Sequence, residues 1–244
     1  MDKLIFGSAV DSKNGSSEDL ANNLKKALTL SNEAVELSFT SLHKVTSSQE
    51  VIDLFNEFKY KSIHLPVVEQ IGNNKIFLEY PDSKLNDTLK VIDSIIDKSS
   101  PNTVLIHPDQ VSDFSWAKSK YGKMLAFENM DADKKFGKTI EDMKKVFDLC
   151  PDAKWVFDVN HIYTNDNTME TAKDFYNVFK DRLTHYHLSG YGGFHDALCS
   201  SKEDIILKGI QSLDFPIIDE GDLLSKGVLE EEFEYISNRI QDYI

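Results

Sequence analysis

Titratable side chains recur where buried strands of this sequence should end. The segment WVFDVNH, residues 155–161, begins as an apolar strand and finishes with Asp158 and His161. Burying a carboxylate without a partner is costly in free energy, so Asp158 needs a compensating group. A structural partner, a water molecule or a metal ion could each supply it. The other acidic and imidazole side chains of the chain help to choose among these three.

Six consecutive strand-like segments close with Asp, Glu or His. These residues are His64, His107, Glu128, Asp158, His187 and Glu220. One histidine at a strand end is usually a hydrogen-bonded core residue, but six such ends in succession favour a metal site. Imidazoles and carboxylates without a thiolate suit Zn²⁺, Mn²⁺ or Fe²⁺ better than Ca²⁺. Two further histidines lie just beyond the sixth and seventh strands, His161 and His195.

Strand-like and amphipathic helical segments alternate along the whole chain. The strand candidates cover residues 3–9, 34–40, 61–67, 103–108, 123–129, 154–159, 184–189 and 216–221. Helical periodicity covers residues 17–31, 47–58, 85–99, 139–150, 169–183, 201–213 and 229–244. Residues 109–122 form either a short helix or a loop. This alternation is expected of a parallel sheet with crossover helices.

Eight such units in 244 residues predict one (β/α)8 TIM barrel domain over residues 1–244. An open, doubly wound sheet is the alternative, but no G-x-G-x-x-G or P-loop pattern follows any strand. In a barrel the carboxyl ends of the strands meet at one face, so the six strand-end residues would share a pocket. His185 precedes His187 by two residues on the same strand face, which predicts a lower barrel layer for it. His43 is expected in a surface loop.

Composition limits the partners and the location that we expect. The chain has 27 Lys and Arg against 41 Asp and Glu, and the net charge of −14 argues against a nucleic-acid surface. No segment approaches the roughly 18 to 20 apolar residues that cross a membrane. The N-terminal apolar stretch is too short for a signal peptide, so a cytoplasmic protein is predicted. Cys150 and Cys199 lie too far apart in the sequence to indicate a zinc knuckle.

At its strand ends the sequence resembles the xylose isomerase-like TIM barrels, also called AP endonuclease family 2. This superfamily contains sugar isomerases and epimerases and the endonuclease IV-type AP endonucleases. The resemblance runs from SIHLP through VLIHP, FENMD, FDVNH and HLS to PIIDEG. A Glu, Asp, His, Glu quartet on successive strands holds one catalytic metal ion in that superfamily. The resemblance implies that Glu128, Asp158, His187 and Glu220 form this quartet.

The endonuclease branch has additional ligands that this sequence matches in part. Two early histidines join the first Glu on a second ion, and His64 and His107 resemble them. A third ion is held there by the His after the sixth-strand Asp and by an Asp-x-His pair. His161 and His195 could supply those imidazoles, but Gly193 stands in the place of the Asp. A third ion is therefore not predicted.

The resemblance implies two reactions. A sugar or sugar-phosphate isomerase or epimerase would use one Zn²⁺ or Mn²⁺ ion to bind adjacent sugar oxygens. Glu128 and Glu220 would then move a proton as base and acid, and His161 and His195 would bind the substrate. A phosphodiesterase acting on abasic DNA would instead use two ions bridged by Glu128.

The carbohydrate reaction is the preferred interpretation. Val67 stands where the endonucleases carry an aromatic residue that probes DNA, and the acidic charge disfavours a phosphate backbone. The phosphodiesterase reaction remains the alternative, because it uses His64 and His107. A catalytically silent barrel that binds a sugar or a partner protein is a second alternative, although a ligand residue is present on every required strand.

Overall fold

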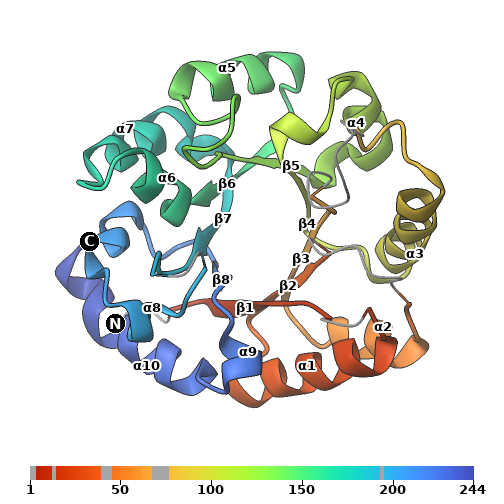
Figure 1. Cartoon of the computed structure of the whole chain (residues 1–244), viewed down its shortest axis with the longest axis horizontal. Helices are drawn as coiled ribbons and strands as arrows, with labels where there is room; N and C mark the ends of the chain where they lie inside the picture. Colours follow the sequence, from red (N-terminus) through yellow and green to blue (C-terminus); the bar gives the residue numbers. More distant parts are fainter. Residues whose placement is uncertain (1–3, 13–14, 40–45, 68–76, 193–194) are drawn as a thin grey trace.

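A closed barrel of parallel strands forms the centre of the structure, a computed structural model that describes residues 4–12, 15–39, 46–67, 77–192 and 195–244. The strands pair in chain order and β1 also pairs with β8, so the sheet closes on itself (Figure 1). They are β1 Phe6–Val10, β2 Ala34–Ser38, β3 Tyr60–His64, β4 Thr103–Ile106, β5 Leu125–Glu128, β6 Lys154–Asp158, β7 Leu183–Leu188 and β8 Ile217–Asp219. The predicted (β/α)8 barrel is confirmed.

Helices surround the barrel on its outside (Figure 1). They are α1 Ser17–Leu30, α2 Gln49–Phe55, α3 Ser83–Ser99, α4 Phe114–Tyr121, α5 Ile140–Leu149, α6 Val159–Asn165, α7 Glu170–Phe179, α8 Leu198–Ser201, α9 Leu223–Lys226 and α10 Leu229–Arg239. Ser16, Asp82 and Thr139 precede α1, α3 and α5, and each side chain accepts the backbone N–H three residues on. Residues 109–122 were predicted to form a short helix or a loop, and they contain the short helix α4.

The segment after β7 differs from its prediction. The periodicity predicts a helix over residues 201–213, but α8 ends at Ser201 and the 3-10 helix η5 covers Asp204–Gly209. Lys202 has a left-handed φ of 66°, a conformation that ends α8. Ile206 and Leu207 are nevertheless fully buried. Their apolar spacing reflects contact with the body of the protein and not a continuous α-helix.

Apolar packing differs between the outside and the inside of the barrel. The large hydrophobic cluster fills the layer between strands and helices, and a separate small cluster comprises Leu105, Ala126 and Val156. Side chains alternate between the two faces of a strand, which places this small cluster in the interior. Polar groups share that interior, where Ser62 donates a hydrogen bond to Glu36 over 2.6 Å. Within the described ranges, no helix is both long and apolar enough to cross a membrane.

Gly7 allows β1 and β2 to approach each other closely. A Cβ atom at residue 7 would overlap the backbone carbonyl of Ala34. We therefore expect Gly7→Ala to lower the free energy of unfolding by about 3 kcal/mol, because the backbone can move away only by breaking the strand pairing. Gly227→Ala is the control: its Cβ would meet nothing within 4 Å, but Gly227 has a left-handed conformation with φ of 70°, and the change should cost only about 1 kcal/mol. Equal losses in urea denaturation would contradict the steric explanation.

Candidate metal centre

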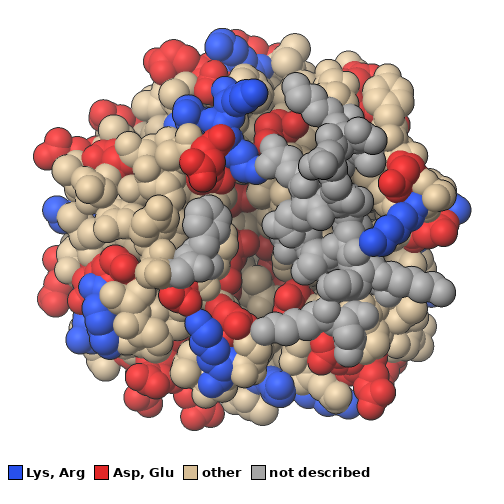
Figure 2. Space-filling model, in the orientation of Figure 1, with Lys and Arg blue, Asp and Glu red and all other residues tan. Residues whose placement is uncertain are grey.

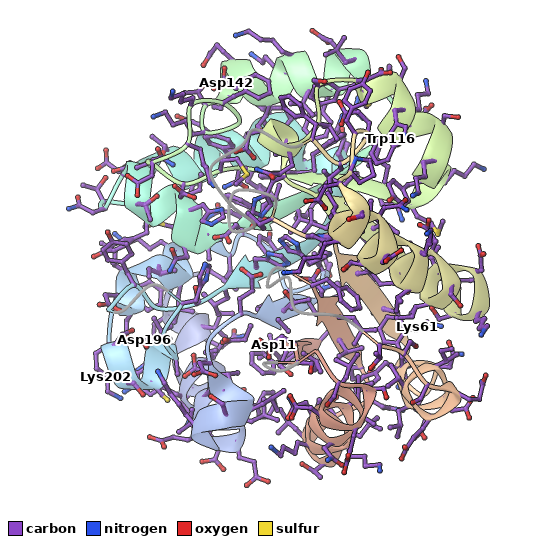
Figure 3. The ribbon with its side chains drawn as sticks, turned by 45° about the vertical axis from the view of Figure 1, so that its right-hand side comes forward. Asp11, Lys61, Trp116, Asp142, Asp196 and Lys202 are labelled. Carbon is purple, nitrogen blue, oxygen red and sulfur yellow. The ribbon has the colours of Figure 1, made fainter. Side chains whose placement is uncertain are left out.

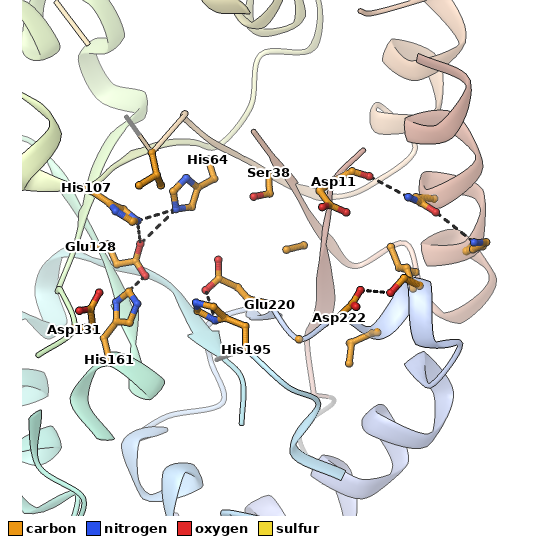
Figure 4. A pocket seen from close by; sticks show the side chains of 18 of the residues that line it. Asp11, Ser38, His64, His107, Glu128, Asp131, His161, His195, Glu220 and Asp222 are labelled. Atoms are coloured by element: carbon orange, nitrogen blue, oxygen red, sulfur yellow. Dashed lines mark hydrogen bonds and ion pairs between the residues drawn. The ribbon is translucent and has the colours of Figure 1, made fainter. Parts of the chain in front are cut away.

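Four of the six strand-end residues line one cavity of about 580 Å³ at the carboxyl face of the barrel, and the other two, Asp158 and His187, are buried outside its lining. Figure 2 shows a hollow at the centre of this face, with acidic side chains around it. Figure 3 places Asp11, which follows β1, near the centre of the molecule and Asp142 and Lys202 at its periphery. His64, His107, Glu128, His161, His195 and Glu220 all line the cavity (Figure 4).

The quartet implied by the resemblance comes together in space. Glu128, Asp158, His187 and Glu220 each offer a ligand atom, and these four atoms lie within 4.8 Å of one another. Nδ1 of His187 is 3.1 Å from Oε1 of Glu128 and 3.3 Å from Oε2 of Glu220. These side chains come from β5, β6, β7 and the residue after β8. The order of the strands around the barrel therefore produces a four-ligand cluster.

Two histidines form a second cluster with the same Glu128. Nε2 of His64 and Nε2 of His107 are 3.1 Å apart, and they lie 3.6 and 3.2 Å from Oε2 of Glu128. A tetrahedral Zn²⁺ ion with bonds of about 2.0 to 2.1 Å separates its ligand atoms by roughly 3.3 Å. Nδ1 of His64 lies 2.8 Å from the carbonyl oxygen of Leu65, which can only accept. Nδ1 therefore carries a proton, and a neutral His64 has a lone pair on Nε2 for a cation.

Asp158 meets the expectation of a carboxylate in need of a partner. It is 1% exposed, and its Oδ1 accepts the backbone N–H of His161 over 2.7 Å. Its Oδ2 is buried without a hydrogen-bond partner among the described residues. Burial, reinforced by the charge of Glu128, raises the pKa of Asp158 well above its usual value. A bound cation would offset both effects, so the residue fits a metal site.

The charges of the four-ligand cluster also favour a bound cation. Burial opposes ionisation of Glu128, but the charge on His187 and hydrogen bonds from surrounding histidines lower its pKa well below the usual value. Burial likewise opposes protonation of His187, but Glu220, Glu36 and Glu128 raise its pKa well above the usual value. Without an ion, a proton on His187 supplies one positive charge near the buried carboxylates. A divalent ion would supply two positive charges at the same place.

His161 reaches the site because α6 begins directly after β6. Nδ1 of His161 lies 2.8 Å from the carbonyl oxygen of Asn129, so Nδ1 is the protonated nitrogen. Asn129 in turn accepts the backbone N–H of Asp158 and donates to its carbonyl oxygen. The end of β6 and the ring of His161 are therefore held together. Nε2 of His161 remains as a hydrogen-bond acceptor.

His195 lies at the edge of the cavity. Its side chain is 32% exposed, with Nδ1 3.9 Å from Oε2 of Glu220 and 3.0 Å from the hydroxyl of Ser189. Burial lowers the pKa of His195, which favours the neutral ring. Both residues predicted to bind substrate thus line the cavity. Gly193 and His43 lie outside the described residues.

Sequence reasoning missed Glu36, which the structure places beneath the quartet. Glu36 is fully buried in the middle of β2, and its Oε1 lies 3.2 Å from Nε2 of His187. The available signal was a carboxylate inside the otherwise apolar segment AVELS. His185 lies in the same lower layer, as predicted, with Nε2 3.5 Å from Glu36.

The rim of the cavity adds further charged groups. Among the described residues that line it, the carboxylates are Asp11, Asp19, Glu128, Asp131, Glu220 and Asp222, and the lysines are Lys26 and Lys134. In the view of Figure 4, Asp11 and Asp222 lie across the cavity from Glu128. Excess carboxylate in a concave site attracts cations and disfavours anions.

Comparison with solved structures shows that the chain shares its barrel fold with a xylose isomerase domain-containing protein and with an epimerase. A xylose isomerase domain-containing protein from Salmonella typhimurium LT2 matches with a TM-score of 0.60 and 11% identity, over 99% of this chain and 97% of that one. An L-ribulose 3-epimerase matches with a TM-score of 0.56 and 10% identity, over 93% of this chain and 86% of that one. No protein-family model matches the sequence. No curated protein matches it either.

Proposed function

We propose that the protein is a divalent-metal-dependent sugar isomerase or epimerase. The observation that carries this proposal is the placement of Glu128 and Glu220 in one cavity. They come from β5 and from the end of β8, and both contact the same nitrogen of His187. Two carboxylates beside one ligand cluster are what a reaction that removes and returns a carbon-bound proton needs.

The ionisation of the two carboxylates supports this role. Burial opposes ionisation of Glu220, but the charge and hydrogen bond of His187 bring its pKa to about 2. Because the pKa of Glu128 is also lowered, both carboxylates are ionised at neutral pH without an ion, which is the form a general base must have. Nε2 of His161 would accept a hydrogen bond from a substrate hydroxyl, because Nδ1 carries the proton. A divalent ion on the quartet would act as a Lewis acid toward adjacent substrate oxygens.

The charged rim favours a neutral sugar over a sugar phosphate. A phosphate group would enter a cavity whose described lining has six carboxylates and two lysines. Lys134 also lies 3.9 Å from Asp109, which reduces its value as an anion partner. The likeness in fold to an L-ribulose 3-epimerase agrees with a carbohydrate substrate.

One observation favours a second candidate function, the two-ion phosphodiesterase acting on abasic DNA. His64, His107 and Glu128 converge on one point, and Glu128 belongs to both clusters. A bridging carboxylate between two ions is the arrangement that such a reaction uses. Two features disfavour a DNA substrate, the acidic lining and the small, buried Val67 that lines the same cavity.

A substrate panel tests the proposal. Protein loaded with Mn²⁺ or Zn²⁺ is assayed on ketoses and aldoses, on their phosphates and on an abasic-site duplex, with deuterium uptake from D₂O as the readout for the sugars. We expect deuterium in one neutral sugar, and at least about tenfold lower kcat/KM for its phosphate. Cleavage of the duplex without uptake into any sugar would overturn the proposal in favour of the hydrolase.

The double variant His64→Ala/His107→Ala serves as the internal control for this panel. In an isomerase or epimerase the quartet alone holds the essential ion, so the variant should retain bound metal and a measurable fraction of sugar turnover. In a hydrolase the same change should lower duplex cleavage by about three orders of magnitude or more, because the first ion site would lose two of its three ligands.

A further inference from the structure

Glu36 lies in the interior of the barrel, one layer below the quartet. Its side chain has no exposed surface. Oε2 accepts a hydrogen bond of 2.6 Å from Ser62 and lies within hydrogen-bond distance of Nε2 of His187, at 3.3 Å. Oε1 lies 3.2 Å from the same nitrogen but has no hydrogen-bond partner among the described residues. His185 faces it from the same strand as His187. The polar groups in contact with Glu36 in the described part of the chain are therefore hydroxyl or imidazole groups, and none is Lys or Arg.

An ionised carboxylate in such a position requires a strong hydrogen-bond donor, because burial of an unpaired charge is costly. The Ser62 hydroxyl supplies one donor. His187 is the closer of the two facing imidazoles, at 3.2 Å against 3.5 Å for His185. The N–H of His187 is thus the main compensating group for the carboxylate.

The two ring nitrogens of His187 face opposite ways. Nδ1 faces Glu128 and Glu220 in the quartet, whereas Nε2 faces Glu36. A neutral imidazole that binds an ion through Nδ1 must carry its proton on Nε2. That proton points at Glu36. A carboxylate that accepts the second N–H of a ligand histidine orients the ring and increases its basicity as a ligand.

Glu36, His185 and His187 could in principle hold an ion themselves, since they too offer ligand atoms within 4.8 Å of one another. His187 would then have to give both nitrogens to ions and lose both ring protons. A hydrogen bond from His187 to Glu36 does not require the loss of a second proton.

We propose that Glu36 is a positioning residue that holds His187 with Nδ1 toward the metal ion and Nε2–H toward the barrel interior. This inference rests on the proposed metal-dependent function. His185 supports Glu36 from below, because its own Nδ1 lies 2.8 Å from the hydroxyl of Tyr60. That hydroxyl lies 2.8 Å from the side-chain oxygens of both Thr103 and Thr184. A continuous polar chain thus runs from the lower barrel to the ligand cluster.

The variant Glu36→Gln tests this role, since it keeps the size of the side chain and removes its charge. We expect the dissociation constant for Zn²⁺, measured by competition with a chromophoric chelator, to rise about 10- to 100-fold. The visible absorption spectrum of the Co²⁺-loaded protein should change as well, because the orientation of one ligand changes. Far-ultraviolet circular dichroism in the presence of chelator checks that the variant folds.

Tyr60→Phe is the matched control in the same polar chain. It removes the hydroxyl next to His185 but leaves the contact between Glu36 and His187 intact. It should lower stability and leave the Zn²⁺ affinity and the Co²⁺ spectrum at their wild-type values. An equal loss of affinity in both variants would show that Glu36 has a general structural role only.

A double-mutant cycle tests whether Glu36 acts through His187. In the His187→Ala background, Glu36→Gln should weaken metal binding less than about twofold, whereas in the Asp158→Asn background it should keep its full effect. Equal effects in both backgrounds, or wild-type affinity in Glu36→Gln, would overturn this inference and leave the proposed function standing. Wild-type protein that binds no divalent ion would overturn both.

Discussion

Glu220→Gln should lower turnover of the sugar substrate by about three orders of magnitude while leaving the barrel folded. A positioned general acid or base contributes roughly 10²- to 10⁴-fold to a rate, and glutamine can neither accept nor return a proton. Glu220 faces the cavity from the end of β8, and the charge of His187 keeps it ionised with a pKa of about 2, against the effect of burial. Deuterium uptake into the neutral sugar measures the loss directly.

Glu220 also belongs to the ligand cluster, so its two roles have to be separated. The variant is assayed at increasing metal concentration until the bound metal, measured by elemental analysis, equals that of the wild type. Asp222→Asn is the control, because Asp222 lines the same cavity outside both ligand clusters. It should change turnover less than about tenfold. Recovery of wild-type turnover by metal-saturated Glu220→Gln would rule out a proton-transfer role for this carboxylate.

Glu128→Ala should have the largest effect on metal binding, because Glu128 belongs to both clusters. In Glu128→Ala we expect the dissociation constant for Zn²⁺ or Mn²⁺ to rise at least about 100-fold. In Asp158→Asn, which affects only one cluster, it should rise at least about tenfold. Metal analysis of protein purified without chelators, followed by titration, gives both numbers. The fold should survive, because the cluster lies above the small apolar layer of the barrel interior.

Asp131→Asn controls for a general effect of charge in the cavity. Asp131 is 5% exposed and lines the cavity, but it belongs to neither cluster. Its Oδ1 accepts the backbone N–H of Asp133 over 2.9 Å, a bond that an asparagine oxygen preserves. The metal content of the Asp131→Asn variant should equal that of the wild type. Unchanged metal content in Glu128→Ala and Asp158→Asn as well would show that these two carboxylates are structural.

Much of this architecture was predictable from local patterns. Strands and helices follow from the spacing of apolar residues over a few positions, and a barrel places the carboxyl end of each strand at one face. For that reason the positions of His64, Glu128 and Asp158 at strand ends sufficed to predict that they would meet. The helix predicted over residues 201–213 was wrong, because burial of Ile206 and Leu207 depends on packing that a periodic pattern does not distinguish from an α-helix.

The sequence by itself determined the eight alternating units and the polar strand ends, because both depend on side chains that are close together along the chain. Only the tertiary structure decided which polar groups touch. Glu36 and His187 are 151 residues apart in the sequence and belong to β2 and β7, which are not neighbours in the sheet. Their contact exists because the closed barrel brings inward-facing side chains of distant strands to one axis. His64, His107 and Glu128, by contrast, lie at the ends of the neighbouring strands β3, β4 and β5, so their meeting follows from the strand order that the sequence predicts.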